Sequence, residues 1–468
     1  MWSLSGFSQE KIPLYQKIVR LIEQLISQGA LVADVPLPAE RKLATLLDVN
    51  RSTVIHALDI LSERGVLIRR VGSGTYINPD KWGVQTQPVI RWQNTLKNKS
   101  SYDLTPYQRQ VKQLYNNVNG HHILNLANGD LADDLLPSLK MPELPWSELI
   151  VKETESESDK FGLLSLRKSV QRYLQVNYQL TVPVDEILIT SGTQQALFLI
   201  TQGLLKAGDS IGVEAPSYFY SLPLFQASGI RIIPIATDEE GIVPSELATV
   251  VTQRNIKMLF INPIFQNPTG SVMSRLRKEV ILDYCKKHQI PIVEDDAYSA
   301  LRFNDTVDIA PLKQLDVHQQ VIYVGSLSKY VGPHLRIGWM VGPKQILADL
   351  AHIRQNIDSG LSILPQLLAD HFLKEEWDSQ IRLLKQQLSR RSERLQNWLN
   401  DRFADDVVFN SPLGGYHLYA RFPHHNRTQL TQLLQSLLSN GIVVTEGALF
   451  GERGSAIRLS FGHFKERV

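Results

Sequence analysis

The sequence has little cysteine, little net charge and no long apolar run, and each shortage argues against a class of protein. Its 468 residues contain one cysteine, Cys285, so no internal disulfide can form and a disulfide-stabilised secreted scaffold is excluded. No run of about 18 apolar residues occurs without polar interruption, so no membrane span is expected. The first residues also lack the basic-then-apolar pattern of a secretory signal. We therefore expect a cytoplasmic protein.

What is present indicates a large, modular globular chain. Apolar residues make up 43% and charged residues 21%, a balance typical of large cores, and the length suggests more than one domain. The net charge is only +2, but residues 1–120 hold 15 Lys and Arg against 9 Asp and Glu, a net of +6, which leaves −4 for the rest. A basic N-terminal quarter on an acidic remainder hints at a polyanionic partner.

The N-terminal region shows the pattern of three helices followed by a hairpin. Apolar residues recur at helical spacing over 12–28. A second helix is predicted to open at Pro38, and a third to run from Arg51 to about Arg64. Apolar runs at 66–68 and 75–77 flank the glycine turn 72–74 and predict a two-stranded hairpin. This order predicts a winged helix-turn-helix.

In such a domain the third helix would read DNA. Its start is polar and basic, and free backbone amides at a helix N-terminus favour phosphate. Arg41, at the start of the second helix, would contact the DNA backbone, and the wing residues Arg69, Arg70 and Gly72 could enter the neighbouring minor groove. A small helical dimerisation module with solvated charges is the alternative. The expected DNA-binding residues are Arg41, Asn50, Arg51, Ser52, Thr53 and Gly72.

Residues 12–78 resemble the GntR-type winged helix. The similarity rests on four segments: 37–41 (Leu-Pro-Ala-Glu-Arg), 49–54 (Val-Asn-Arg-Ser-Thr-Val), 57–58 (Ala-Leu) and 72–75 (Gly-Ser-Gly-Thr). The resemblance implies DNA contacts from Arg41 and Arg51, supported by Asn50, Ser52 and Gly72. Some members read DNA with an arginine at the position of Ile55 or a histidine at that of Val71, so no operator sequence is implied.

The rest of the chain is predicted to be a connection and a larger domain. Residues 79–120, rich in Asn, Gln and Lys, are expected to form a basic linker with a short helix from Tyr107 to Tyr115. From residue 121, strand-like runs alternate with amphipathic stretches, which predicts an α/β fold with a mainly parallel sheet. Its large part is expected at about 180–345, and its smaller α/β part at about 121–179 and 346–468. The clearest strand-like runs are 187–189, 210–213, 258–261, 291–293 and 321–324.

Two residues in this larger domain predict a pyridoxal 5′-phosphate (PLP) site. Lys329 follows a predicted strand, and a lysine amine can form a Schiff base with PLP. Asp295, 34 residues earlier, ends another strand, where a carboxylate can hold the pyridine nitrogen protonated.

Further residues at strand ends complete the prediction. Tyr298 and Asn267 can donate to the ring phenolate, and Tyr218 can stack on the ring. Each of these is alone more often structural, but their gathering at the strand ends of one sheet favours a site. The phosphate would be held by a strand-to-helix turn, two serines and an arginine: Gly192, Thr193, Gln194, Ser326, Ser328 and Arg336.

Over about residues 121–468 the chain resembles the fold-type-I aminotransferases. The resemblance implies that Lys329 is the Schiff-base lysine and catalytic residue, Asp295 the pyridinium partner, and Arg458 the residue that grips a substrate carboxylate. It also implies a homodimer. Joined to a GntR-type domain, this architecture looks like the MocR/GabR family of transcriptional regulators.

One position departs from the family pattern. Relatives usually carry a tyrosine that reaches the partner's cofactor phosphate where this chain has Glu157, and an acidic side chain there would repel phosphate. This favours a DNA-binding regulator that senses an amino compound, or PLP itself, through an aldimine on Lys329. The alternatives are a working aminotransferase with a DNA-binding domain, or a regulator whose second domain only dimerises. No metal site is expected, since the histidine pairs lack a ligand set.

Overall fold

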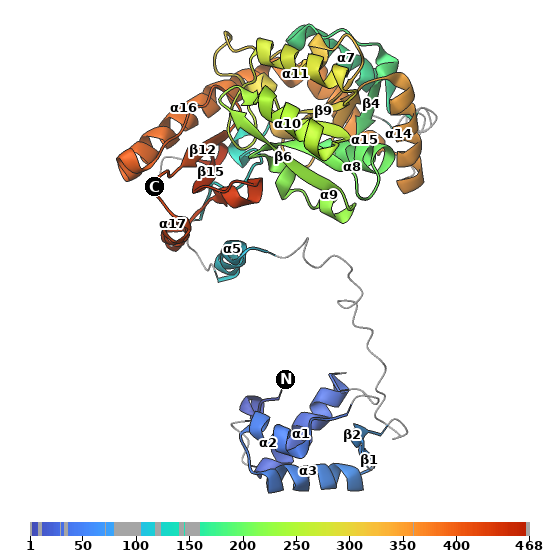
Figure 1. Ribbon diagram of the computed structural model, residues 1–468, viewed down its shortest axis with the longest axis vertical. Helices are drawn as coiled ribbons and strands as arrows, with labels where there is room; N and C mark the ends of the chain where they lie inside the picture. The colour runs from blue at the N-terminus through green and yellow to red at the C-terminus, as the bar shows by residue number, and fades with distance from the viewer. Residues whose placement is uncertain are drawn as a thin grey trace. The chain divides into compact units, whose positions relative to one another are not determined.

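The computed structural model describes residues 2–7, 12–28, 30–31, 36–70, 72–78, 104–117, 123–139, 145, 160–358 and 360–464. The chain divides into two compact units, Met1–Lys99 and Ser100–Val468 (Figure 1). In this described part of the chain, no helix combines the length and apolarity needed to cross a membrane.

The first unit is a winged helix. Its elements are a 3-10 turn η1 (Ser5–Phe7), α1 (Leu14–Ser27), α2 (Glu40–Leu47), α3 (Arg51–Glu63), β1 (Leu67–Arg70) and β2 (Gly74–Ile77). The two strands pair antiparallel, with Leu67 opposite Ile77. α2 begins two residues later than predicted at Pro38, because the amide of Leu37 donates to Thr75 O at 2.8 Å and holds that segment extended beside β2.

The apolar stripes of the three helices meet in one core. Ile18 of α1, Leu43 of α2, and Val54 and Leu61 of α3 are fully buried, and each such side chain stabilises the fold by about 1.5–3 kcal/mol. Asp48 caps α2 in the left-handed conformation, with φ 53°, which turns the chain sharply into α3. The packing leaves the first turn of α3 exposed, with Arg51 and Ser52 in solvent.

The second unit is built on an eight-stranded sheet among the described residues, in the order β4-β11-β10-β9-β8-β5-β6-β7. β10, β9, β8, β5 and β6 run parallel in succession, while β11 is antiparallel to both its neighbours and β7 is antiparallel to β6. The predicted mainly parallel sheet is therefore confirmed. The strands are β4 (Ile187–Thr190), β5 (Ser210–Ala215), β6 (Arg231–Asp238), β7 (Gly241–Ile242), β8 (Met258–Ile261), β9 (Ile292–Asp296), β10 (Val321–Ser326) and β11 (Gly338–Val341).

Both faces of this sheet are buried. Alternate residues point to opposite faces of a strand; accordingly Phe260 and Val293 join one apolar cluster while Leu259 and Ile292 join another. The helices that follow in sequence are α7 (Leu164–Tyr178), α8 (Thr193–Leu204), α9 (Pro223–Ala227), α10 (Pro244–Arg254), α11 (Arg275–Lys287), α12 (Leu312–Leu315), α13 (Ser328–Val331), α14 (Lys344–Ile357) and α15 (Ile363–His371). α14 packs against α8, so it lies with the large part, although residues from 346 were predicted in the small part.

A smaller sheet, β12-β15-β14, forms the other part of the second unit. Its strands are β12 (His417–Arg421), β14 (Thr445–Glu446) and β15 (Ala456–Ser460), while β3 (Leu124–Asn125) pairs with β13 (Ile442–Val443). The long helix α16 (Trp377–Phe403) and α17 (Arg427–Ser439) accompany them (Figure 1). Short turns complete the unit: η3 (Asp133–Leu135), η4 (Val184–Glu186), η5 (Tyr218–Ser221), η6 (Ser299–Leu301), the π-helical η7 (Phe372–Glu376), η8 (Ala404–Asp406), η9 (Gly447–Phe450) and η10 (Phe461–His463).

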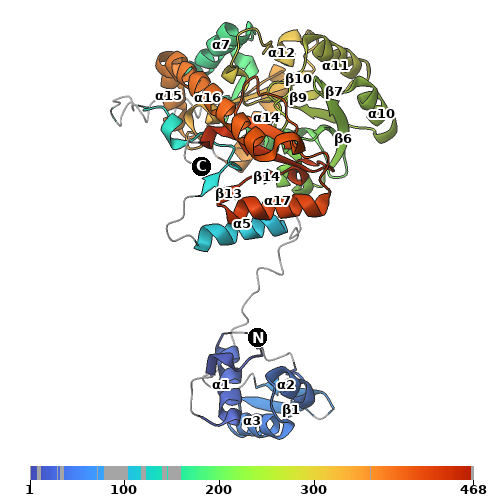
Figure 2. The same cartoon turned by 90° about the vertical axis from the view of Figure 1, so that its left-hand side faces the viewer.

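The predicted linker, residues 79–120, ends earlier in the chain than expected. Residues Pro106–Asn117 form α5, beside α17 in Figure 2. The buried Tyr107 hydroxyl accepts from Val444 N at 3.2 Å, and Thr105 Oγ1 donates to Glu446 Oε1 at 2.6 Å. The helix expected from Tyr107 to Tyr115 is thus confirmed and belongs to the second unit, because its polar and apolar contacts lie there. Residues 79–103 lie outside the described part.

Candidate cofactor site and nucleic-acid interface

The carboxyl ends of neighbouring strands meet at one edge of the large sheet, as expected for a parallel arrangement. Direct hydrogen bonds tie the loops that leave these ends. The amide of Tyr218, after β5, donates to Asn267 O, after β8, at 2.9 Å. Asn262 Nδ2, also after β8, donates to Asp295 O, at the end of β9, at 2.7 Å. The structure therefore brings together residues that the sequence separates widely.

Lys329 lies just beyond β10 at this edge, on the short helix α13. Its Nζ donates to Gly129 O at 2.7 Å and lies 3.4 Å from Asp130 Oδ1. Burial lowers the pKa of Lys329, a shift that the neighbouring Asp130 partly opposes. A lowered pKa favours the neutral amine, which is the nucleophilic form.

Asp295 is a buried carboxylate that lacks a full set of partners. The residue is only 3% exposed, and its Oδ1 accepts no hydrogen bond among the described residues. Burial, reinforced by the adjacent Asp296, raises the pKa of Asp295 to about 7. A buried polar atom without a partner is costly. A protonated ring nitrogen would supply the missing donor, so this carboxylate fits the expected cofactor.

The turn after β4 forms a cradle at the N-terminus of α8. Gly192 caps this helix with φ 79°, a conformation that favours glycine, and no side chain occupies the cap. A Cβ atom on Gly192 would lie 3.3 Å from Arg336 Nη2, the atom that donates to Ser191 O at 3.2 Å. An uncapped helix N-terminus beside a guanidinium suits an anion. Arg336 itself adopts a left-handed φ of 53°.

The other residues predicted for the phosphate lie around this cradle. Thr193 and Gln194 begin α8, half-buried and exposed respectively. Ser326 ends β10, and its Oγ donates to Ile337 O at 3.3 Å and accepts from Ser328 N at 3.1 Å. The structure thus places all of them at the carboxyl edge, and their contacts with a phosphate stay a prediction.

Arg458 of β15 extends from the small sheet to the same region. Its Nη1 donates to Asn267 Oδ1 at 2.9 Å and its Nη2 to Ala127 O at 2.8 Å, while its Nε has no partner among the described residues. Burial lowers the pKa of Arg458 to about 10. The buried guanidinium therefore remains charged at neutral pH and retains one donor for a carboxylate.

Tyr298 and Tyr218 differ in their surroundings. The Tyr298 hydroxyl is buried 3.0 Å from His417 Nε2, and burial raises the Tyr298 pKa well above its usual value, so the phenol keeps its proton. The Tyr218 hydroxyl is buried without a partner in the described part of the chain, and its ring packs 4.4 Å from that of Phe219. Stacking of Tyr218 on a cofactor stays a prediction.

Sequence reasoning missed His417, Gly129 and Asp130. His417 is 3% exposed, and a Cβ on Gly129 would lie 3.6 Å from its ring and 3.9 Å from Arg458 Nη2. No local motif marks these residues, since only the packing of β12 and of segment 123–130 against the large part brings them to Lys329. We call Gly129, Asp295, Tyr298, Lys329 and Arg458 the Lys329 site. Glu157 lies outside the described residues.

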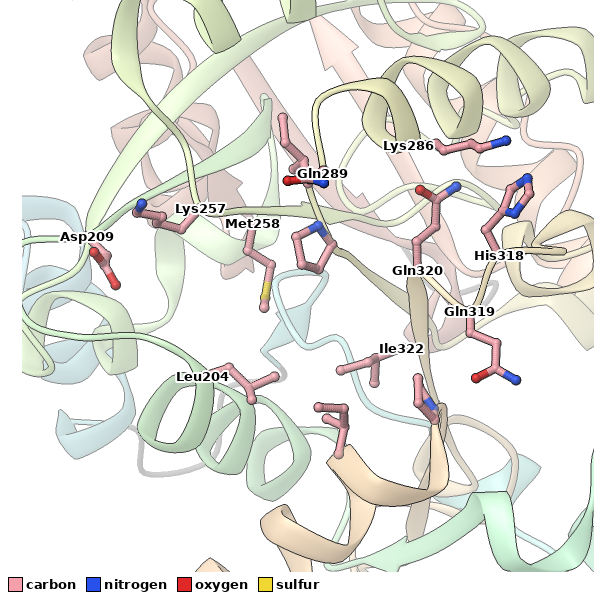
Figure 3. Close-up of a pocket in the computed structure, with 14 residues that line it drawn as sticks. Leu204, Asp209, Lys257, Met258, Lys286, Gln289, His318, Gln319, Gln320 and Ile322 are labelled. Atoms are coloured by element: carbon pink, nitrogen blue, oxygen red, sulfur yellow. The ribbon is translucent and has the colours of Figure 1, made fainter.

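A groove of about 580 Å³ lies elsewhere, at the opposite edge of the large sheet. Its lining includes Asp209, Lys257, Pro291 and Gln320, which immediately precede β5, β8, β9 and β10 (Figure 3). None of the predicted site residues lines it. This groove therefore lies away from the chemically equipped edge.

In the first unit, the N-termini of α2 and α3 lie close together. Arg51 Nη2 forms a 2.9 Å ion pair with Glu40 Oε2, although the Arg51 side chain is still 51% exposed. Arg41 and Ser52 are exposed, Thr53 is half-buried, and Asn50 caps α3 without a side-chain hydrogen bond. These side chains remain available to a ligand.

The wing presents a second basic stretch. Gly72 turns the hairpin with φ 77°, and a Cβ there would meet nothing within 4 Å. Arg69 pairs with Asp59 at 2.5 Å, and the Arg70 guanidinium lies 4.7 Å from the centre of the Tyr76 ring. Val71 lies outside the described residues. A DNA-binding role for these residues stays a prediction.

Comparison with known proteins matches the two units to two families. Residues 121–468 match "Aminotransferase class I and II", and residues 14–77 match "Bacterial regulatory proteins, gntR family". An uncharacterized HTH-type transcriptional regulator of Bacillus subtilis, YdfD, is 32% identical over 97% of this chain and 93% of its own length. The HTH-type transcriptional regulator NorG of Staphylococcus aureus is 28% identical over 91% of this chain and 95% of its own length.

A solved structure supports the fold of the second unit. Kynurenine aminotransferase of Pyrococcus horikoshii, in complex with PMP, superimposes with a TM-score of 0.68 at 24% identity, over 80% of this chain and 93% of that one. At this identity the likeness shows the fold alone. The expected combination of a GntR-type winged helix and a fold-type-I aminotransferase domain is confirmed.

Proposed function

Since this chain belongs to the aminotransferase class I and II family and joins to it a gntR-family domain, we propose that it is a PLP-dependent transcriptional regulator. The full-length relatives named HTH-type transcriptional regulators support this proposal, as does the resemblance to the MocR/GabR family.

The pairing of Lys329 with the unpartnered Asp295 carries the cofactor proposal. PLP, when bound, supplies an aldehyde that condenses with amines and a ring that withdraws electrons. Asp295 Oδ1 would hold the ring nitrogen, Tyr298 and Asn267 the ring oxygen, and Lys329 the aldehyde carbon. The turn at Gly192, with Arg336, would hold the phosphate. Among the described residues, no other buried carboxylate has both an oxygen without a hydrogen-bond partner and an electrostatic interaction with a lysine whose pKa is lowered.

The effector we propose is an amino compound or PLP itself. An amine would compete with Lys329 for the cofactor, and a carboxylate on the same molecule would reach Arg458. A guanidinium suits a carboxylate because it stays charged, and the Nε of Arg458 has no partner among the described residues. Together, Lys329 and Arg458 therefore favour an amino acid as the effector.

The DNA-binding proposal rests on the exposed first turn of α3. Double-stranded DNA would meet Arg51, Ser52 and Asn50 in its major groove, while Arg41 neutralises a phosphate. We further propose a homodimer, so that two winged helices bind two half-sites. Sedimentation of the cofactor-bound protein at micromolar concentration should show a dimer, and a monomer would contradict it.

A borohydride trapping experiment tests the regulator directly. Reduction should fix PLP covalently to the wild-type chain and fail in Lys329→Ala, while Lys257→Ala, at the opposite edge, should behave as wild type. The same three proteins are titrated with operator DNA, with and without candidate amino acids. Amino acids should change DNA affinity only in the proteins that retain Lys329. Equal trapping in Lys329→Ala would remove this lysine as the anchor.

The same residues would also serve an aminotransferase, so turnover separates the two functions. We expect conversion of amino and keto acids far below about 1 s⁻¹, the low end of ordinary enzymes, because Glu157 replaces the usual tyrosine. Turnover at enzyme rates across a panel of amino acids would favour the aminotransferase.

A further inference from the structure

His417 was not expected from the sequence, yet it is the partner of Tyr298. The Tyr298 hydroxyl lies 3.0 Å from His417 Nε2, and the two rings meet edge to face at 5.3 Å between centroids. On the other side of the ring, His417 Nδ1 is buried and has no hydrogen-bond partner among the described residues. The imidazole is therefore held at one nitrogen only.

Neutral histidine carries one proton, and its position decides which group donates. Burial, aided by Arg458 and Lys329, lowers the pKa of His417 well below its usual value, so the ring is neutral. A proton on Nδ1 would be a buried donor without an acceptor, which folded proteins rarely tolerate. On Nε2 the same proton reaches the Tyr298 oxygen. That tautomer leaves the Tyr298 proton without an acceptor among the described residues, so it is favoured when the cofactor's ring oxygen is present to accept that proton.

This tautomer determines the direction of the hydrogen bond. If His417 Nε2 donates, the Tyr298 oxygen is the acceptor, and the phenol's own proton is not used on His417. No other acceptor for that proton is found in the described part of the chain. We propose that His417 is a positioning residue whose Nε2–H engages the Tyr298 oxygen and so directs the Tyr298 proton into the Lys329 site, toward the cofactor's ring oxygen. The inference rests on the proposed function.

Several charged groups surround Tyr298 and His417 and influence the pKa of each. Arg458 acts on both Tyr298 and His417, Lys329 acts on His417, and Asp295 and Asp130 act on Tyr298. Tyr416, which immediately precedes β12, packs with its ring centre 5.1 Å from that of Tyr298. Variants of His417 leave all these charges in place, so a change in titration reports on the hydrogen bond itself.

The first arm of the test compares His417→Gln with His417→Phe. Glutamine can place an amide N–H where Nε2–H was, whereas phenylalanine fills the space without a donor. A stronger Tyr298 donor stabilises the deprotonated ring oxygen of the lysine-bound cofactor. His417→Phe should therefore raise the pH midpoint of the cofactor's visible absorption by about 0.5–1 unit. His417→Gln should restore a midpoint near that of wild type, and Tyr298→Phe should abolish the difference between the two His417 variants.

The second arm reads the tautomer directly. Nitrogen-15 chemical shifts of labelled histidine, assigned by the signal lost in His417→Gln, should show Nε2 protonated and Nδ1 unprotonated in the PLP-bound protein. A proton on Nδ1, or equal midpoints for wild type and His417→Phe, would overturn the inference. A protein that binds no PLP would instead refute the proposed function. A cooperative denaturant unfolding transition of each variant, close to that of wild type, checks that the second unit folds.

Discussion

The two units place their functional side chains in opposite environments. In the winged helix, Arg51 is 51% exposed and is paired with Glu40 at the surface. In the second unit, Asp295 is 3% and Arg458 8% exposed, and the pKa of each is displaced by burial. Exposed charges interact weakly and are screened by salt, whereas buried charges interact strongly with few partners. The first unit is thus suited to a long polyanion, and the second to one small molecule.

Removing the buried carboxylate should give the largest effect. Asp295→Asn keeps the shape but cannot hold a positive ring nitrogen, so PLP affinity should fall by about 2–5 kcal/mol, the cost of losing one member of a buried charge pair. Spectroscopic titration with PLP measures it. Asp209→Asn, at the opposite sheet edge, is the control and should bind PLP as wild type does.

The buried carboxylate should also make stability depend on pH. The pKa of Asp295 is raised from 3.8 to about 7, so the folded state binds a proton more tightly than the unfolded state. This contribution is complete below about pH 4 and is lost as the pH rises through about 7. Between pH 5 and 8, wild type should lose about 3 kcal/mol more than Asp295→Asn. Denaturant unfolding of the cofactor-free proteins measures it, and parallel curves would contradict it.

Arg458 tests whether the effector carries a carboxylate. Arg458→Ala should weaken the response of DNA binding to an amino acid by about 1.5–3 kcal/mol, the value of a charged hydrogen bond. Basal DNA binding should persist, because Arg458 lies in the other unit. An unchanged response would show that Arg458 does not bind the effector's carboxylate. If no amino acid gives a response, PLP itself is favoured as the effector, and Arg336→Ala should impair sensing.

Arg51 brings the comparison to the exposed surface. Arg51→Ala should reduce specific DNA affinity by about 1–3 kcal/mol if the side chain meets a base edge. If Arg51 contacts only phosphate, the loss of affinity should be similar for all DNA sequences. The slope of log affinity against log salt concentration should then be smaller by about 1. Fluorescence anisotropy at several salt concentrations separates these outcomes, and unaltered binding would exclude α3 as the reader.

Glu40 should give the smallest effect. Glu40→Gln removes the exposed partner of Arg51, and such pairs contribute less than about 1 kcal/mol. Non-specific DNA affinity should rise slightly, since a negative charge is lost, while the preference for operator falls because Arg51 is less well oriented. Asp59→Asn, which frees Arg69 instead, is the matched control. A loss as large as that of Arg51→Ala would show that Glu40 itself meets the DNA.

The sequence predicted the elements of both units well where a short local pattern determines them. The apolar spacing of α1 and α3 is local in this sense. So are the short segments that place Asp295 and Lys329 at the ends of strands. It failed at Pro38 and at the end of the linker, because a hydrogen bond to Thr75 and the packing of Tyr107 decide those boundaries. It missed His417 for the same reason: its role depends on Tyr298, 119 residues away.

Arg336 shows what the site costs the fold. A non-glycine residue at a φ of 53° is destabilised by about 1–2 kcal/mol relative to the right-handed conformation, and glycine would relieve that strain. Only arginine, however, brings a guanidinium to the turn at Gly192. Selection for thermal stability alone would therefore favour replacing this residue. An engineer who stabilises the domain by consensus or computational design should therefore keep Arg336, because stability and ligand recognition favour different residues at this position.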